Sequence, residues 1–220
     1  MKRILGATLL ALLAPGLAVG ASIIADDFES YADTTALGAV WNLGDGTLDA
    51  ASGNPGQSLN HPGTGASFSG GNTNSRTFAP TVPAAGQTLR YSVDIFDDGS
   101  SANKRTTAGI RTAAGANILE MGMYNSPSYY AYRVVLFDTP APGSGGWVSF
   151  SSMVDDLGGA ISNTPVQGWH RFMVEITDSQ AVFSLDLNSD GVINATATES
   201  IAFNATGGLD IIRLGGPSDL

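Results

Sequence analysis

The 220-residue chain contains no cysteine, and it has only two histidines, His61 and His170. Disulfide bonds, cysteine nucleophiles and the Cys/His clusters that bind zinc are therefore excluded. No serine lies in a G-x-S-x-G turn, and no glycine-rich phosphate loop follows a candidate strand. These absences argue against serine and cysteine hydrolases and against nucleotide-binding proteins.

Basic side chains are also few. The chain has 10 Lys and Arg against 20 Asp and Glu, which gives a net charge of −10. Without Lys2 and Arg3, 8 basic side chains face the same 20 acidic ones, and the net charge becomes −12. Because such a surface repels phosphate backbones, we expect no nucleic-acid partner.

Only one long apolar run is present, and it lies at the amino terminus. Two basic residues precede the apolar run 4–19, and small residues offer cleavage after Gly20 or Ala21. This pattern predicts a secretory signal peptide over residues 1–21, hence a secreted or cell-surface location. We expect residues 22–220 to form one domain with no membrane span after signal cleavage.

Alternation of apolar and polar residues with a period of two is the strongest structural signal. It is clearest over 169–199, which predicts three antiparallel strands joined by tight turns, the second ending in Asp190-Gly191. Further strands are predicted at 22–28, 89–96, 106–111, 118–124, 129–137, 147–150 and 209–214. The Gly-rich region 44–79 predicts short edge strands in long loops, and no helix is predicted. About ten strands predict an all-β, antiparallel two-sheet jelly-roll sandwich.

Five segments carry a family resemblance: ADDFESYAD (25–33), ALGAVW (36–41), EMGMYN (120–125), YAYRVVLF (130–137) and GWHRF…VFSLDLNSDG (168–191). They resemble secreted bacterial proteins with a concanavalin A-like lectin/glucanase fold, also called laminin G-like. Many members of that family carry a carboxy-terminal PEP-CTERM sorting tail. Such domains end on a strand of the type F-D-N-h-x-L beside the first strand. We expect the domain at 22–220 to be truncated before that last strand.

Paired catalytic carboxylates are missing from the predicted strands. Laminarinase-type hydrolases of this fold carry E-x-D-x-x-E, with the two carboxylates about 5–5.5 Å apart. The chain has no such string, and its four glutamates are widely scattered. EMGMYN resembles the strand that carries a tyrosine acid/base in jelly-roll alginate lyases, but the accompanying Gln-x-His pair is absent. We therefore predict that the protein is not an enzyme.

The loop after the second strand of the trio is a candidate Ca²⁺ site. Asp186, Asn188 and Asp190, followed by Gly191, match the first half of a D-x-N-x-D-G loop. Oxygen ligands at positions one, three and five suit a hard cation. Position twelve is Ala197 instead of the bidentate glutamate, so a polar hairpin tip is the alternative.

The family resemblance implies a second structural Ca²⁺ site near the amino terminus. Related jelly rolls hold calcium with carboxylates and carbonyls from the first and last strands. Asp26, Asp27 and Glu29 are the corresponding candidates. A bound cation would also stabilise a secreted domain that lacks disulfides.

Aromatic side chains supply candidate carbohydrate-binding rings, because sugars stack on flat rings with polar groups at their edges. Alternation places Tyr130 and Tyr132 on one face of their strand, and Trp147 follows a glycine-rich loop. The predicted glycan site combines these rings with Tyr124 and Arg133. The alternative for each ring is packing in the core or at the rim of the sandwich.

We therefore expect a non-catalytic, extracellular carbohydrate-binding or matrix-associated module whose partner is a polysaccharide or cell-surface glycan. Two alternatives stay open. One is a structural surface or exopolysaccharide-associated protein without a small ligand, and the other is a divergent polysaccharide hydrolase or lyase. A continuous groove lined by Tyr130, Tyr132 and Trp147 would favour the glycan-binding module, whereas buried or scattered rings would favour the structural protein.

Overall fold

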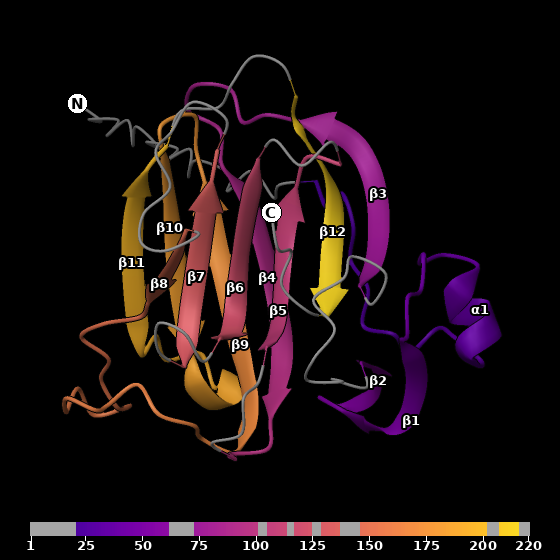
Figure 1. Ribbon diagram of the computed structural model, residues 1–220, viewed down its shortest axis with the longest axis horizontal. Helices are drawn as coiled ribbons and strands as arrows, with labels where there is room; N and C mark the ends of the chain where they lie inside the picture. Colours follow the sequence, from indigo (N-terminus) through magenta and orange to yellow (C-terminus); the bar gives the residue numbers. More distant parts are fainter. Residues whose placement is uncertain are drawn as a thin grey trace, which may run out of the picture.

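Two antiparallel β-sheets lie face to face and make up most of the protein (Figure 1). The structure is a computed structural model that describes residues 21–61, 73–100, 105–113, 117–124, 129–136, 146–201 and 207–215. The larger sheet contains β3 (Asn74–Thr81), β5 (Arg105–Arg111), β6 (Ile118–Tyr124), β7 (Tyr130–Val135), β8 (Trp147–Ser149) and β12 (Leu209–Gly215). Its strands follow one another in the order β3-β12-β5-β6-β7-β8.

The smaller sheet faces the larger one and has four strands. They are β4 (Leu89–Asp97), β9 (Gly168–Ile176), β10 (Gln180–Asp186) and β11 (Ala195–Ser200), in the order β11-β10-β9-β4. A separate hairpin and a short helix lie together beyond the β3 side of the larger sheet (Figure 1): β1 (Thr47–Gly53), β2 (Gly56–Asn60) and α1 (Thr34–Gly38). One 3₁₀ turn, η2 (Leu187–Ser189), follows β10.

The sequence periodicity predicts most of these strands. The predicted strand 118–124 coincides with β6, and the predicted trio over 169–199 corresponds to β9, β10 and β11. The hairpin between β10 and β11 places Leu185 opposite Ala195. The region 44–79 contains β1, β2 and β3, of which β3 is an edge strand of the larger sheet. The all-β, antiparallel class is therefore confirmed.

The predicted first strand is wrong, because the segment 22–28 forms no strand in the structure. Asp26 organises this segment through its side chain instead. Its Oδ2 accepts hydrogen bonds from Trp41 Nε1 (2.9 Å), Arg76 Nη1 (2.8 Å) and the Tyr31 hydroxyl (2.5 Å), while its Oδ1 accepts from Phe28 N (3.0 Å). Phe28 has a φ of 64°, so the chain turns where a strand would continue. Local side-chain to backbone bonds of this kind compete with sheet pairing.

The helix α1 was not predicted either, and it is only five residues long. It begins after Asp33, whose Oδ1 accepts a hydrogen bond from Ala36 N at 2.8 Å. This contact satisfies one of the free N–H groups at the helix start. A helix of this length is too short to show a period of 3.6 residues, so the sequence pattern cannot reveal it.

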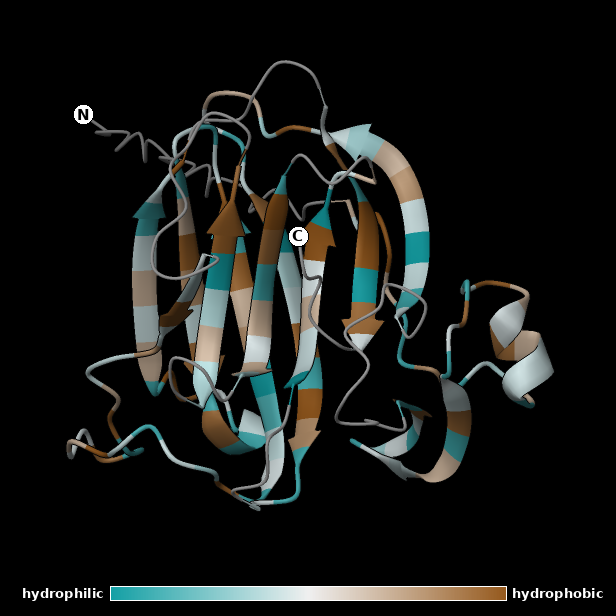
Figure 2. Ribbon diagram, viewed as in Figure 1, coloured by the Kyte–Doolittle hydropathy of each residue, from teal (hydrophilic) through white to brown (hydrophobic). Residues whose placement is uncertain are grey.

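The main hydrophobic core lies between the two sheets. Hydrophobic and hydrophilic residues alternate along most strands (Figure 2), and buried hydrophobic side chains from both sheets form one cluster. Tyr132 stacks on Phe183 with ring centroids 4.7 Å apart, and Tyr130 lies 6.1 Å from Phe172. Trp41 belongs to a second buried cluster, with Tyr31 and Leu37.

A buried polar network lies at one end of this core and joins the two sheets. The Tyr130 hydroxyl donates to Asp97 Oδ2 (2.9 Å) and accepts from Val166 N (3.0 Å). The Tyr129 hydroxyl donates to Asp97 Oδ1 (2.9 Å), which also accepts from Gly99 N (2.8 Å). Asp97 has no exposed surface, so these donors stabilise a carboxylate that would otherwise be costly to bury.

His170 extends the network to the turn after β10. Its Nδ1 accepts from Asn188 N (3.0 Å), which assigns the proton to Nε2, and Nε2 lies 2.7 Å from Val166 O. Burial lowers the pKa of His170 below its usual value, while the Val166 carbonyl, Asp97 and Asp186 act in the opposite direction. The folded protein therefore holds this histidine neutral.

We predict opposite effects for two tyrosine-to-phenylalanine substitutions in the core. Tyr130→Phe removes a donor from buried Asp97 and should lower the free energy of unfolding by about 1–3 kcal/mol. Tyr91→Phe is the matched control, because the Tyr91 hydroxyl is buried without a hydrogen-bond partner in the structure. It should leave stability unchanged or raise it by up to about 1 kcal/mol. Urea unfolding checks both, and equal losses in the two variants would contradict the role of the network.

We also predict a pH dependence of stability that comes from His170. In the unfolded chain a histidine protonates at about pH 6.5, whereas the folded protein disfavours that protonation. Stability should therefore be full above this pH and should fall as the pH drops through it towards the lowered folded pKa. Melting temperatures between pH 8 and 5.5 measure the effect. The background should be His61→Gln, because burial also lowers the pKa of His61. Adding His170→Gln should flatten the profile, and an unchanged slope would refute the assignment.

Candidate functional site

Two residues of the predicted glycan site, Tyr130 and Tyr132, lie inside the sandwich. Tyr130 has no exposed surface and Tyr132 has 5%, because both point from β7 towards the smaller sheet. The Tyr132 hydroxyl donates to Glu199 Oε1 at 2.7 Å, across the core rim. The predicted groove lined by Tyr130, Tyr132 and Trp147 is therefore wrong. The two tyrosine rings pack in the core, on the opposite side of the sheet from Trp147.

The other predicted residues lie on the outer face of the larger sheet. Tyr124 and Trp147 stack on each other with ring centroids 4.4 Å apart and an angle of 6°. The Arg133 guanidinium lies 5.7 Å from the Trp147 ring, and that of Arg105 lies 5.0 Å from the Tyr124 ring. Arg133 also forms an ion pair with Glu120 at 3.3 Å. Both faces of this aromatic pair are thus in contact with protein groups, and Trp147 is only 3% exposed.

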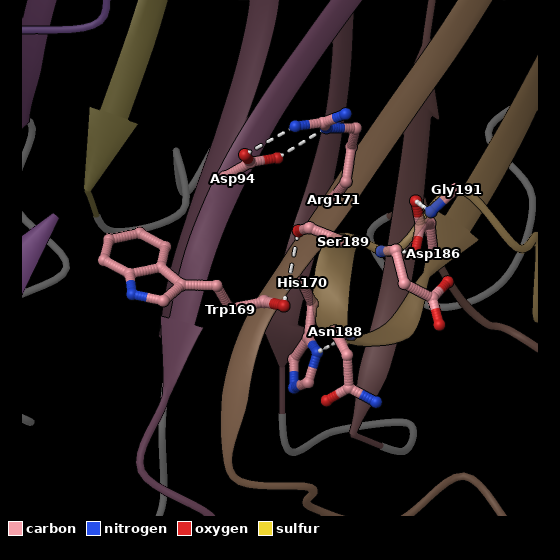
Figure 3. Close-up of polar contacts among 9 residues, drawn as sticks. Asp94, Trp169, His170, Arg171, Asp186, Asn188, Ser189 and Gly191 are labelled. Carbon is pink, nitrogen blue, oxygen red and sulfur yellow. Dashed lines mark hydrogen bonds and ion pairs between the residues drawn. The ribbon is translucent and has the colours of Figure 1, made fainter. Parts of the chain in front are cut away.

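In the candidate calcium loop after β10, backbone N–H groups of the loop bond to the first candidate ligand, Asp186. Asp186 is buried, and its two oxygens accept from Asp190 N (3.0 Å) and Gly191 N (2.9 Å). The side chain of Asn188 points away from that of Asp186 (Figure 3). The three predicted ligands therefore do not converge in this arrangement, which matches the alternative of a polar hairpin tip.

The amino-terminal candidates likewise bond to protein groups. The carboxylate of Asp26 is held by Arg76 and two aromatic donors, Asp27 Oδ1 accepts from Glu29 N at 3.1 Å, and Glu29 Oε1 accepts from Gln57 N at 2.6 Å. Among the described residues, no group of three His, Asp or Glu side chains is arranged to hold a metal ion. A structural Ca²⁺ at either place stays a prediction.

A different set of side chains forms an open surface on the outer face of the smaller sheet. Strands β4 and β9 pair in register, and their outward residues form a ladder of cross-strand pairs. We call the following pairs the outer ladder: Phe96–Trp169, Asp94–Arg171, Ser92–Met173 and Arg90–Glu175. Neighbouring pairs along two strands lie about 7 Å apart.

An aromatic pair ends the outer ladder. The rings of Phe96 and Trp169 have centroids 5.6 Å apart at an angle of 56°. Phe96 is 47% exposed and Trp169 is half-buried, so Trp169 lies on the outer face of the sheet and not in the core. The reason is the strand period: His170 points inward, and its neighbour Trp169 must point outward (Figure 3).

The next pair of the ladder is a bidentate ion pair. Arg171 donates from Nε to Asp94 Oδ1 and from Nη2 to Asp94 Oδ2, both at 2.8 Å (Figure 3). The hydrogen bonds that Arg171 donates to the Asp94 carboxylate raise the pKa of Arg171, so the guanidinium stays charged. The side chains of Arg171 and Asp94 are 42% and 21% exposed, respectively. Solvent can therefore reach N–H groups of Arg171 and oxygen lone pairs of Asp94.

A cleft of about 1450 Å³ runs beside β4 and reaches this ladder. One side is formed by β4 itself, and the other by residues 21–29 and the β1-β2 hairpin. Trp169, Phe96 and Arg171 line one part of it. The aromatic and charged pairs of the ladder thus border this cleft along β4.

Comparison with protein-family models, with curated proteins and with solved structures finds no match to this chain. Within the ranges that the structure describes, no helix has the length and apolar character needed to cross a membrane. Function must therefore be argued from the geometry of the site.

We predict that Asp26 is a structural carboxylate of the amino-terminal region. Asp26→Asn should lower the free energy of unfolding by about 2–3 kcal/mol, because it weakens a partly buried ion pair and the bonds from two aromatic donors. The matched control is Asp27→Asn, whose side chain is exposed and bonds only within its own turn. Thermal melts compare the two variants. Equal melting temperatures would show that the contacts of Asp26 do not stabilise the fold.

Proposed function

We propose that the protein is a non-catalytic, extracellular carbohydrate-binding module with a concanavalin A-like jelly roll, and that it binds glycans at the end of the outer ladder formed by Phe96–Trp169 and Asp94–Arg171. The observation that carries the proposal is the open aromatic pair Phe96–Trp169 beside the bidentate pair Asp94–Arg171. A sugar ring offers an apolar face that stacks on aromatic rings and equatorial hydroxyls that bond to charged groups.

The charges of the ladder favour a neutral glycan. Asp94 and Arg171 neutralise each other, and so do Arg90 and Glu175, which form an ion pair of 2.7 Å. The chain as a whole carries an excess of acidic residues, which would repel a polyanionic polysaccharide. Hydroxyl groups can use the accessible oxygens of Asp94 and N–H groups of Arg171 without adding charge.

The proposal of a binding module instead of an enzyme rests on where the glutamates lie. Each of them contacts another protein group: Glu29 bonds to Gln57, Glu120 to Arg133, Glu175 to Arg90 and Glu199 to Tyr132. They belong to different elements and do not form a facing pair of the kind that glycoside hydrolysis needs. The signal-peptide pattern at 1–21 supports export, and the partner proposed is a polysaccharide or cell-surface glycan.

A structural surface protein without a small ligand is the second candidate. Burial of Tyr130 and Tyr132 and the occupied faces of the Tyr124–Trp147 stack favour it. The outer ladder distinguishes the candidates, because a purely structural protein has no need of accessible polar groups beside exposed rings. In this second case Phe96 and Trp169 act only as a cross-strand pair of the sheet.

The deciding experiment is affinity electrophoresis and calorimetry against neutral, acidic and amino-sugar polysaccharides. We expect binding to at least one neutral polysaccharide, and a loss of affinity of about tenfold or more in Trp169→Ala and in Arg171→Ala. The matched control is Arg90→Ala, which removes another exposed arginine of the same ladder that is also ion-paired. It should retain nearly full affinity.

Two outcomes would reject this assignment. Binding that Trp169→Ala leaves unchanged would place the glycan elsewhere. Absence of binding to every polysaccharide would favour the structural protein. Melting in EDTA and in Ca²⁺ within the same series checks the predicted structural cation, since a ligand that binds only the native state raises the melting temperature.

A further inference from the structure

The two sheets have unequal widths, and the difference leaves part of the larger sheet uncovered by strands. Strand β4 packs over β5. Since β12 and β3 follow β5 in the larger sheet, they extend beyond the last described strand of the smaller one (Figure 1). Ile212 and Leu214 of β12 contact both the main core and the amino-terminal cluster. Between these two clusters lies the cleft beside β4.

Strand β4 presents a long free edge to this cleft. It is nine residues long and pairs along its whole length with β9, and no other strand in the described ranges pairs with it. All residues from 89 to 96 line the cleft. A straight edge of this length offers backbone N–H and C=O groups in the pattern that an added strand needs.

The cleft floor and walls define what such a strand must look like. The floor is apolar, with Phe78, Ile110, Ile212 and Leu214 beneath the gap. An inserted strand must therefore carry apolar side chains at alternate positions, because successive side chains point to opposite faces. Exposed acidic residues of the opposite wall, such as Asp27, favour basic side chains at the positions between.

The wall at 21–29 also limits the size of the occupant. Its residues line the same cleft as β4, so whatever pairs with the edge must fit beside them. A single extended segment needs only about 4.8 Å of width in the plane of the sheet. We propose that the free edge of β4 accepts one extended polypeptide segment from a partner protein, with apolar residues at alternate positions and basic residues between them. This proposal is independent of glycan binding on the outer ladder.

The test uses two nine-residue peptides of one composition, K-V-K-V-T-V-K-V-T and V-V-V-V-K-K-K-T-T, added to the purified protein. Hydrogen exchange resolved at single amides should show new protection in β4 with the alternating peptide and none with the blocky one. Asp27→Lys should weaken that binding about tenfold. Asp178→Lys is the matched control, because it makes the same charge change in the exposed turn between β9 and β10, outside the cleft. It should have little effect.

Three results would overturn the proposal. Equal protection by both peptides would mean unspecific attraction of basic peptides. Protection of all β4 amides in the monomer without peptide would mean that another segment of this chain already occupies the edge. Protection that grows with protein concentration, together with a dimer in sedimentation, would mean that a second copy does. Binding of the alternating peptide with unchanged affinity in Asp27→Lys would remove the role of the acidic wall.

Discussion

The buried network around Asp97, Tyr130 and His170 is the interaction on which the rest of the structure depends. Tyr130 comes from the larger sheet, whereas Asp97 is the last residue of β4 and His170 lies near the start of β9, both in the smaller sheet. The network also holds the loop at Val166 and the turn at Asn188 through their backbone groups. Because each buried polar group needs its partner, the network fixes the relative position of two sheets that apolar contacts alone would leave free to slide.

The same network determines the chemistry of the outer surface. His170 must point inward to reach Val166, and the strand period then turns Trp169 and Arg171 outward. The register of β4 against β9 brings Phe96 and Asp94 opposite them. A surface that can stack and hydrogen-bond a ligand is therefore a direct result of how one buried histidine is held.

Much of the fold could be predicted from the sequence, since strands with one buried face show their period directly. The alternation over 169–199 predicts three strands. It also indicates that Trp169 points outward, because His170 and Phe172 share the inward face. The positions of the residues in the predicted glycan site were harder to derive. Along β7 neither face carries a run of charge, so the pattern Tyr-Ala-Tyr-Arg shows which residues share a face but not which face is the core.

Other features depend on contacts between residues far apart in the chain. Phe96 belongs to a predicted strand, β4. Its pairing with Trp169 depends on the register between β4 and β9, which are more than seventy residues apart in the chain. Asp26 binds Arg76 across fifty residues, and no local pattern marks it as the centre of its region. Sequence periods describe single strands, whereas a site formed by two strands depends on their register.

The position of β12 has a consequence for the order in which the chain can acquire its structure. This strand, encoded late in the chain, lies between β3 and β5, both of which are made much earlier. As the polypeptide emerges from its amino terminus, β3 has no neighbour in the larger sheet until residues 209–215 arrive. Until then, the backbone N–H and C=O groups of β3 and β5 that face β12 have no strand partner there. Strand pairing across such long sequence separations is slow. The larger sheet can therefore close only after residues 209–215 have been synthesised.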